Sequence, residues 1–387
     1  MTGRLTDEAY ARAALTYLAE PADRWLGQLL RLHGAAVTLD AIKSGLLPAA
    51  GAARPAGQGR RSLRAAMERW QTRLPELPAP EQVASASGPG VRLVCPGDPE
   101  WPGQLADLGD EQPYALWLRG QADLRFNCLR AVAIVGARAA TAYGTYVAAE
   151  LAASLAARGL TVVSGGAFGV DAAAHRGALG ADGVTVAVLA CGVDTPYPAA
   201  HAELFDAIAA QGVIVSEWPP GRPVSRLRFL VRNRVIAALA AGTLVVEAGQ
   251  RSGAVNTARH ARDLHRPLMA VPGPVTSDLS AGCHQIIRDW QGTLVTTAYE
   301  VIEQLAPLTA PPLAQPDATP PQVFPRDQLD TDSATVLDAL PRRGGASTLR
   351  VAQRAGVDPV TAARCLGGLA TAGFVERCED GWRLRRG

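Results

Sequence analysis

The sequence is almost without lysine, which excludes one kind of chemistry and nearly excludes another. Lys43 is the only lysine among 387 residues, although Lys and Arg together number 38. A P-loop nucleotidase needs the lysine of its GxxxxGK[ST] motif, so this class is excluded. A Schiff-base mechanism would have to depend on Lys43. Arginine therefore carries the basic chemistry, and its planar guanidinium suits phosphate groups.

The sequence also lacks cysteine pairs and long apolar runs. Its six cysteines are far apart and form no CxxC pair, which favours reduced thiols over a zinc site. No HExxH motif is present, so no metal is expected. No apolar run reaches the roughly 18 residues of a membrane helix, and the first residues lack the apolar core of a signal peptide. We expect a cytoplasmic protein with no membrane partner.

Positive charge is concentrated in one segment. The net charge of the chain is only +2, yet residues 222–266 hold nine arginines against Glu247 and Asp263, which gives this segment +7. A basic segment in a nearly neutral chain is expected where a polyanion binds. The alternative is a solvated surface with scattered arginines.

Apolar segments alternate regularly with helical ones from Ala131 onward. The predicted strands are 131–135, 160–164, 185–189, 212–216, 243–247 and 267–271. The predicted helices between them are 143–158, 170–179, 199–211, 229–241 and 253–265. This alternation predicts an α/β fold with a Rossmann-like, doubly wound, mostly parallel sheet. Ligands of such sheets bind at the carboxyl ends of the strands.

Composition divides the chain into four parts. The predicted parts are a helical domain (1–88), an extended Rossmann-like domain (89–305), a Pro-rich linker (306–331) and a winged-helix domain (332–387). In the second part, short strands at 91–95 and 115–118 are expected beside the main sheet. In the last, three helices precede a hairpin around Asp380-Gly381, which is the winged-helix order.

Two Gly-rich turns follow the first two predicted strands of the sheet. We expect the backbone amides there to be free to face an anion. The candidate residues are Gly136 and Arg138 in the first turn, and Ser164, Gly165, Gly166 and Gly169 in the second. The GxGxxG fingerprint is missing and no acid follows the second strand, so no dinucleotide cofactor is expected. Asp171 and His175, one helical turn apart, are interpreted as an ion pair and not as metal ligands.

The segment SRLRFLVRNR interleaves arginines with an aromatic residue. Arg226, Arg232 and Arg234 would contact phosphates and Phe229 a base, as in grooves that bind single-stranded nucleic acid. Phe229 is equally compatible with a place in the core. Ser252 opens a further helix and offers another amino-terminal anion site.

Many motifs occur together in a characteristic order. IVGAR, SGGAFGVDAAAH, GVDTPYP, SEWPPG, FLVRNRVI, VVEAGQRSGAVNTAR and AVPG make residues 91–295 resemble the DprA/Smf family of DNA-processing proteins. This resemblance implies a protein that binds and protects single-stranded DNA and loads the RecA recombinase during natural transformation. It also implies that the helical domain (1–88) is SAM-like and that the extended Rossmann-like domain (89–305) binds the DNA. A homodimer formed through the Rossmann-like domain is implied as well, and no catalytic residues.

The resemblance assigns roles to individual residues. The family's Gly-Ser-Arg turn falls on Gly136-Ala137-Arg138, and its basic residue ahead of the Phe-Pro-x-Arg-Asn-Arg motif falls on Arg226. That motif falls on Phe229, Arg232, Asn233 and Arg234, with Leu230 in place of proline.

In the winged helix, Arg364, Arg377 and Arg383 are the expected contacts to duplex DNA, and the alternative is that this domain binds protein.

An enzymatic alternative is a nucleotide phosphoribohydrolase on the same kind of fold. Those enzymes carry a PGGxGTxxE loop, and the corresponding segment here is EAGQRSGAVNTA. Asn256 stands at the position of the catalytic acid, so the carboxylate that such hydrolysis requires is missing.

Overall fold

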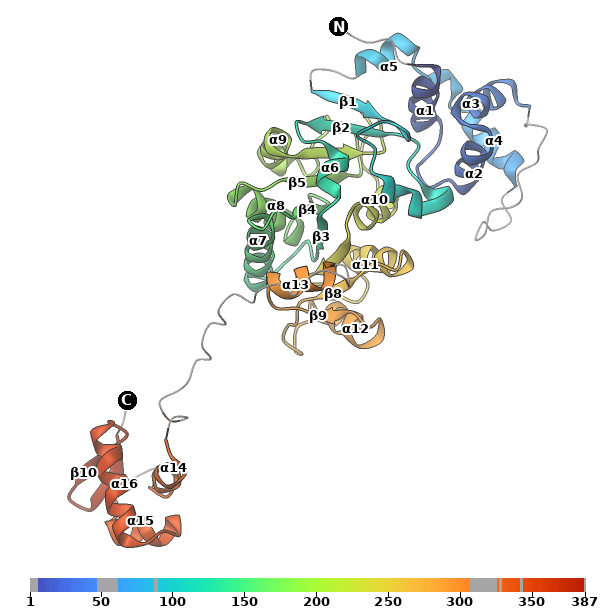
Figure 1. Ribbon diagram of the computed structural model, residues 1–387. Coiled ribbons are helices and arrows are strands. Elements are labelled where there is room, and N and C mark those ends of the chain that lie inside the picture. The colour runs from blue at the N-terminus through green and yellow to red at the C-terminus, as the bar shows by residue number, and fades with distance from the viewer. Residues whose placement is uncertain are drawn as a thin grey trace. The chain divides into compact units, whose positions relative to one another are not determined.

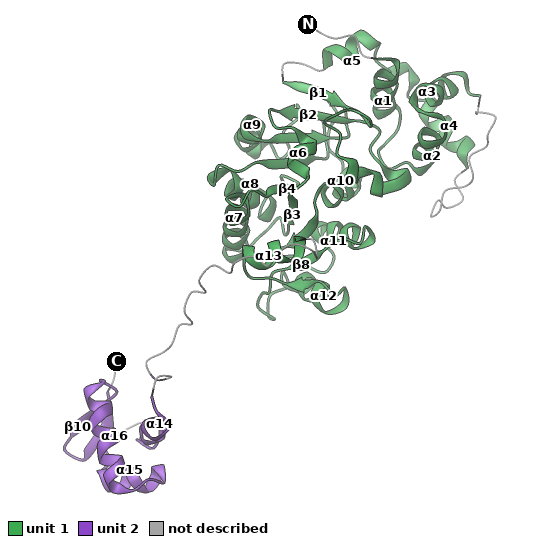
Figure 2. Cartoon of the chain, in the orientation of Figure 1, with its two compact units in different colours: residues 1–313 green, residues 314–387 purple. Residues whose placement is uncertain are grey.

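The chain forms two compact units, residues 1–313 and 314–387 (Figure 2). The computed structural model describes residues 6–46, 62–86, 90–306, 326, 329–341 and 344–385. Most of the predicted Pro-rich linker lies outside the described residues. The N-terminal helices and the sheet belong to the same unit, and the predicted division into four domains stays a prediction.

The first unit begins with a group of helices. They are α1 (Asp7–Leu18), α2 (Arg24–His33), α3 (Ala35–Ser44), α4 (Leu63–Gln71), the 3₁₀ helix η1 (Leu74–Glu76) and α5 (Pro80–Ala86) (Figure 1). Sequence periodicity missed α3, which follows α2 directly at Gly34. Helix α2 packs backbone against backbone on the 3₁₀ segment η2 (Gly103–Glu111), since a Cβ on Gly27 would lie 1.8 Å from the carbonyl oxygen of Asp110.

A carboxylate between α1 and α2 joins these helices to the rest of the unit. Glu20 accepts hydrogen bonds from Arg228 Nη2 at 2.7 Å and from the indole Nε1 of Trp218 at 3.0 Å. These contacts lower the pKa of Glu20 against the opposing effect of burial.

Nine strands form one sheet in the order β1-β2-β6-β5-β4-β3-β7-β8-β9. The strands are β1 (Val91–Val94), β2 (Leu116–Gly120), β3 (Ala131–Val135), β4 (Thr161–Ser164), β5 (Thr185–Leu189), β6 (Val213–Ser216), β7 (Gly242–Val245), β8 (Leu268–Ala270) and β9 (Thr293–Leu294). In this order, every pair of neighbouring strands from β6 through β5, β4, β3, β7 and β8 to β9 is parallel. The first two strands are antiparallel: β1 pairs with β2, and β2 pairs with β6. The mostly parallel sheet is confirmed, with the two early strands at its edge as expected.

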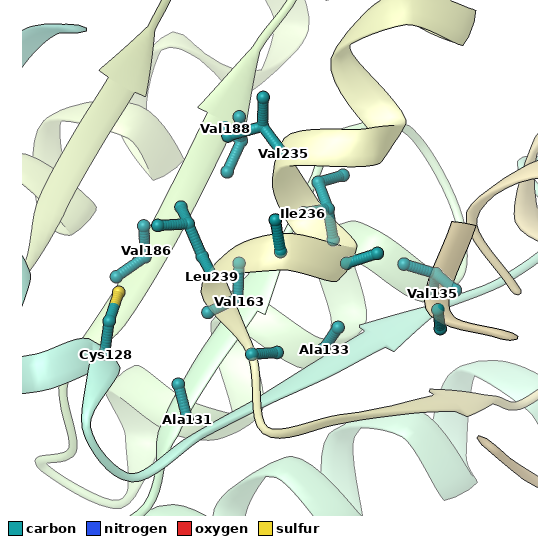
Figure 3. Packing of buried hydrophobic residues seen from close by; sticks show 14 of the residues in the cluster. Cys128, Ala131, Ala133, Val135, Val163, Val186, Val188, Val235, Ile236 and Leu239 are labelled. Atoms are coloured by element: carbon teal, nitrogen blue, oxygen red, sulfur yellow. The ribbon is translucent and has the colours of Figure 1, made fainter. Parts of the chain in front are cut away.

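Helices cover both faces of this sheet. They are α6 (Leu124–Cys128), α7 (Ala142–Ala156), α8 (Val170–Gly180), the 3₁₀ helix η3 (Ala199–His201), α9 (Ala202–Gln211), α10 (Arg226–Leu239), α11 (Gly253–Asp263), α12 (Ala281–Asp289) and α13 (Ala298–Leu305). Side chains of α7, α8 and α13 pack on one face, and those of α10, α11 and α12 on the other. Figure 3 shows Val235, Ile236 and Leu239 of α10 against the strand residues Ala133 and Val188.

The sheet reverses its winding at β3. Strand β3 has β4 on one side and β7 on the other, so the chain leaves the carboxyl ends of β3 and β7 toward opposite faces. A crevice between the loops after these two strands is the usual ligand position of a doubly wound sheet. The fold therefore directs attention to residues 136–141 and 246–252.

The described residues of the second unit form three helices and a hairpin. They are α14 (Thr331–Asp338), α15 (Thr348–Ala355), α16 (Pro359–Thr371), β10 (Val375–Cys378) and β11 (Gly381–Leu384). The order of these elements is the expected one, and the assignment as a winged helix stays a prediction. In the described part of the chain, no helix has the length and apolar character needed to cross a membrane.

Candidate nucleic-acid interface

A cleft of about 810 Å³ opens at the carboxyl ends of β3 and β7. The loop after β3, the start of α10 and the start of α11 supply most of its lining. Seven residues predicted from the sequence line it, namely Gly136, Arg138, Arg226, Phe229, Arg232, Asn233 and Ser252. The cleft thus gathers three segments that are distant in the sequence.

An arginine and two aromatic rings meet in this cleft. The guanidinium carbon of exposed Arg138 lies 4.7 Å from the ring centre of Phe229. The ring of Tyr197, in the loop after β5, lies 5.6 Å from that of Phe229 at an angle of 49°. Phe229 is half-buried and lines the cleft, so it is not a core residue, and its contact with a base stays a prediction. Tyr197 was missed, although it stands in the quoted GVDTPYP motif.

Arg232 is buried beneath the cleft and bonded to the strands. Its Nη1 donates to the carbonyl oxygen of Gly165 at 2.8 Å and to that of Val188, and its Nε donates to Asn233 Oδ1 at 3.2 Å. Burial lowers the pKa of Arg232 to about 10, with Asp171 opposing and Arg138 adding to this shift. The guanidinium stays charged at neutral pH and adds positive potential to the floor of the cleft.

Some amides of the Gly-rich turns are used inside the protein: those of Gly136 and Ala167 face Asp171, and that of Ala137 donates to the Glu247 carbonyl at 2.7 Å. Anion binding by the other amides stays a prediction. Buried Asp171 accepts a hydrogen bond from the amide of Ala167 at 3.4 Å. Burial raises the pKa of Asp171, while Arg232 and the amides of Ala167 and Gly136 lower it. The turns therefore enclose the chain's own carboxylate where a ligand anion was expected.

The glycines of these turns are required by packing. An added Cβ on any of them would fall within 3.0 Å of another atom. The nearest atoms would be a Val170 methyl for Gly136 (2.5 Å), Arg232 Nη1 for Gly165 (2.6 Å), Phe205 for Gly166 (2.6 Å) and the Ala137 oxygen for Gly169 (2.3 Å). Their small size serves contacts within the protein, so close approach to a phosphate is not needed to explain them.

The start of α7 also holds an internal anion. Buried Glu247 accepts from the amide of Thr141 at 2.9 Å and from its hydroxyl at 2.6 Å. A Cβ on Gly144 would lie 2.2 Å from Glu247 Oε2. In a dinucleotide-binding sheet the first helix offers its amino terminus to a pyrophosphate. Here a carboxylate occupies that position, so these residues do not fit such a cofactor.

Five predicted residues do not line the cleft: Gly165, Gly166 and Gly169 of the second turn, and also Arg234 and Ser164. Arg234 has 1% of its side chain exposed and forms a two-pronged ion pair with Glu217, with both N–O distances at 2.6 Å. Ser164 is fully buried, and its hydroxyl donates to the carbonyl oxygen of Ile134 at 2.6 Å. We therefore remove Arg234 and Ser164 from the set of expected DNA contacts.

Asn233 and Ser252 shape the wall at α11. Ser252 Oγ caps this helix by accepting from the amide of Val255 at 3.3 Å. Asn233 Nδ2 donates to the Gly253 carbonyl and to Asn256 Oδ1, both at 3.1 Å. Asn256, which replaces the hydrolase acid, is thus tied to α10. Asp171 is the one carboxylate among the described residues that line the cleft.

In the folded protein, acidic side chains neutralise much of the positive charge of the basic segment (residues 222–266). Five of its nine arginines form ion pairs, four of them with acids from outside the segment. The pairs are Arg222–Glu76, Arg228–Glu20, Arg234–Glu217, Arg262–Asp263 and Arg266–Asp107. Arg226 and Arg251 are exposed, and the described residues offer them no ion pair. Arg251 stands between Gly249 and Ser252, which line the cleft, and sequence reasoning did not select it.

His175 does not pair with Asp171, contrary to the sequence interpretation. Its Nδ1 lies 2.7 Å from Thr185 Oγ1, and burial lowers its pKa to about 3. The imidazole is therefore neutral at physiological pH. Nowhere in the described ranges do three or more His, Cys, Asp or Glu side chains gather as metal ligands would.

The expected arginines of the second unit are engaged in local contacts. Arg383 pairs with Glu376 at 2.6 Å, Arg364 with Asp332 at 3.7 Å, and Arg377 lies over the ring of Trp382 at 5.2 Å. Their role in binding duplex DNA stays a prediction.

Comparison with known proteins agrees with this architecture. The model of the family "DNA recombination-mediator protein A" matches residues 92–306. The DNA processing protein DprA of Mycobacterium tuberculosis (strain H37Rv) is 42% identical over 394 residues, which cover 98% of this chain and 95% of that protein.

Two solved structures are similar. The X-ray structure of DNA processing protein A from Streptococcus pneumoniae has a TM-score of 0.61 and 28% identity, covering 78% of this chain and 98% of that one. A second structure describes the single-stranded DNA binding mode of DNA processing protein A from Helicobacter pylori. It has a TM-score of 0.51 and 28% identity, covering 57% of this chain and 97% of that one. The chain belongs to the DNA recombination-mediator protein A family, that is, to the DprA/Smf DNA-processing proteins.

Proposed function

We propose that this protein binds single-stranded DNA in the cleft between α10 and the loop after β3. It acts in the cytoplasm as a homodimer, protects incoming strands and loads the RecA recombinase onto them during natural transformation. The contact between Arg138 and Phe229 carries this proposal, because it places a phosphate-binding cation beside an aromatic ring in an open cleft. The Helicobacter pylori relative that binds single-stranded DNA supports it.

Binding depends on the backbone of the strand and is indifferent to its sequence. Exposed Arg138 and Arg226 lie on two walls of the cleft and contact phosphates. Buried Arg232 does not reach the DNA strand, but it strengthens the positive potential of the cleft between Arg138 and Arg226. Aromatic rings accept any base, because every base has a π face.

No bond is broken in this function. Asn256 cannot serve as a general base, and Asp171 is buried among amides and near Arg232. The chain therefore acts on its substrate by binding and delivery.

A salt titration with matched variants tests the binding site. Affinity for a single-stranded oligonucleotide should fall steeply with salt, and Arg138→Ala should reduce the slope of log K against log salt by about 0.7, the value of one phosphate contact. Arg130→Ala is the control, since Arg130 is exposed at the opposite end of the same strand, β3. A slope near zero for the unaltered protein, or equal losses in the two variants, would contradict the proposal.

Delivery to the recombinase needs a separate measurement. RecA filament formation on single-stranded DNA should start sooner with the protein present, and Arg138→Ala should lose this effect together with DNA binding. Unchanged nucleation with the unaltered protein would remove recombinase loading from the proposal and leave strand binding intact.

A further inference from the structure

The two aromatic rings of the cleft are not equivalent. The Arg138 guanidinium lies over the Phe229 ring, with its carbon 4.7 Å from the ring centre, and so occupies one face of it. Phe229 is half-buried, whereas Tyr197 is 44% exposed. Phe229 is thus enclosed by its neighbours, and Tyr197 is the ring that reaches the solvent in the cleft.

A base does not fit between the two rings as they stand. Their centres are 5.6 Å apart and the planes are tilted by 49°. A base sandwiched between two rings needs about 7 Å, twice the roughly 3.5 Å of a carbon–carbon contact. An incoming base therefore stacks on the outside of the pair, where Tyr197 offers its exposed surface.

The cleft that holds Tyr197 also carries exposed apolar side chains, which suit a base with its sugar. Leu227 and Leu230 line the same cleft, and they are 75% and 47% exposed. Exposed apolar side chains that gather in one place and are bordered by charge mark a binding surface. Arg226 borders these leucines on α10 and can hold the adjoining phosphate.

We propose that Tyr197 is the ring on which an unpaired DNA base stacks, and that Phe229 is a positioning residue that supports Tyr197 and holds Arg138. This inference rests on the proposed function, because it names the part of the strand that the second ring of the cleft recognises. It changes the role expected for Phe229, which sequence reasoning selected as the stacking residue.

The experiment compares two strands and three variants. The strands are a short oligothymidylate and an abasic strand of the same length, which keeps the phosphates and removes the bases. The variants are Tyr197→Leu, Tyr197→Phe, which keeps the ring, and Phe168→Leu. Phe168 is the control because it is 49% exposed and rests on the His201 ring at 4.6 Å, outside the lining of the cleft. Thermal unfolding checks that each variant is folded.

Tyr197→Leu should bind oligothymidylate at least about 5-fold more weakly, the lower end of what stacking on one ring contributes. The loss should vanish on the abasic strand, and the salt slope should not change. Tyr197→Phe and Phe168→Leu should bind like the unaltered protein.

Two results would overturn the inference while the proposed function stands. One is normal binding of oligothymidylate by Tyr197→Leu while Arg138→Ala still reduces the salt slope. The other is an equal loss with Phe168→Leu, which would place stacking outside the cleft. Failure of the unaltered protein to bind either strand would instead refute the proposed function itself.

Discussion

Replacing Arg234 with Gln should destabilise the fold and leave the affinity of the folded protein for DNA unchanged. The Arg234 and Glu217 side chains are 1% and 3% exposed, and both N–O contacts between them measure 2.6 Å. Arg234 Nε also donates to the carbonyl oxygen of Glu111 at 3.0 Å. The guanidinium thus joins α10 to the end of β6 and to η2, away from the cleft.

The expected loss follows from what remains after the substitution. Glu217 stays buried without its cation, and breaking a buried pair in this way costs about 3–5 kcal/mol. Replacing both partners by apolar side chains, as in Arg234→Met with Glu217→Leu, removes the stranded charge and should recover most of that loss. A double-mutant cycle that adds the single variants Arg234→Met and Glu217→Leu to this double variant measures the coupling of the pair.

The assay is urea unfolding followed by tryptophan fluorescence. Six of the seven tryptophans lie in the first unit, so the signal reports mainly on this unit. DNA affinity is measured in the same buffer without urea and corrected for the folded fraction. A variant Arg234→Gln with unaltered stability and weakened DNA binding would refute the reasoning and return Arg234 to the set of DNA contacts.

Two further predictions concern the buried groups near the cleft. Gly165→Ala should lower the free energy of unfolding by about 1–3 kcal/mol, because its Cβ would lie 2.6 Å from both terminal nitrogens of buried Arg232 and displace a hydrogen-bonded charge. Urea unfolding checks this, and a stable variant that had lost only DNA binding would show that the glycine serves phosphate approach. Burial lowers the pKa of His175 to about 3, below the roughly 6.5 of an unfolded chain. The stability that the neutral, buried imidazole contributes is therefore complete above about pH 6.5 and is lost as the pH falls toward 3. His175→Gln should flatten the decline of stability between about pH 6 and 4 by up to about 1.4 kcal/mol per pH unit, and an unchanged pH profile would show that His175 does not titrate on unfolding.

The sequence predicted the sheet well because its strands are buried on both faces. Strands β3 and β5 begin and end where the apolar runs do, at Ala131–Val135 and Thr185–Leu189. Helix α3 was missed because it has no side-chain cap at its start and follows α2 at Gly34 without a separating loop.

The site was harder to predict, since α10 gives no simple amphipathic pattern. Residues 232–239 of this helix are all buried, so arginines in this part lie under the surface as readily as valines. Spacing alone does not show that Arg226 faces the cleft while Arg234 faces Glu217. Nor does local sequence reveal that Glu20 and Asp107 neutralise arginines more than a hundred residues away.

The hydrogen bonds of Glu20 to Arg228 connect the segment between α1 and α2 to α10, the helix that lines the cleft. The same helix presents Arg226 to the cleft and Arg228 to Glu20, so its position is set from both sides. On the proposed function, a partner that favours a different placement of the N-terminal helices should change the affinity of the cleft for DNA by some factor. By reciprocity, bound DNA changes the affinity for that partner by the same factor. If the cleft binds DNA as proposed, the N-terminal helices would in this way influence how firmly a DNA strand is held.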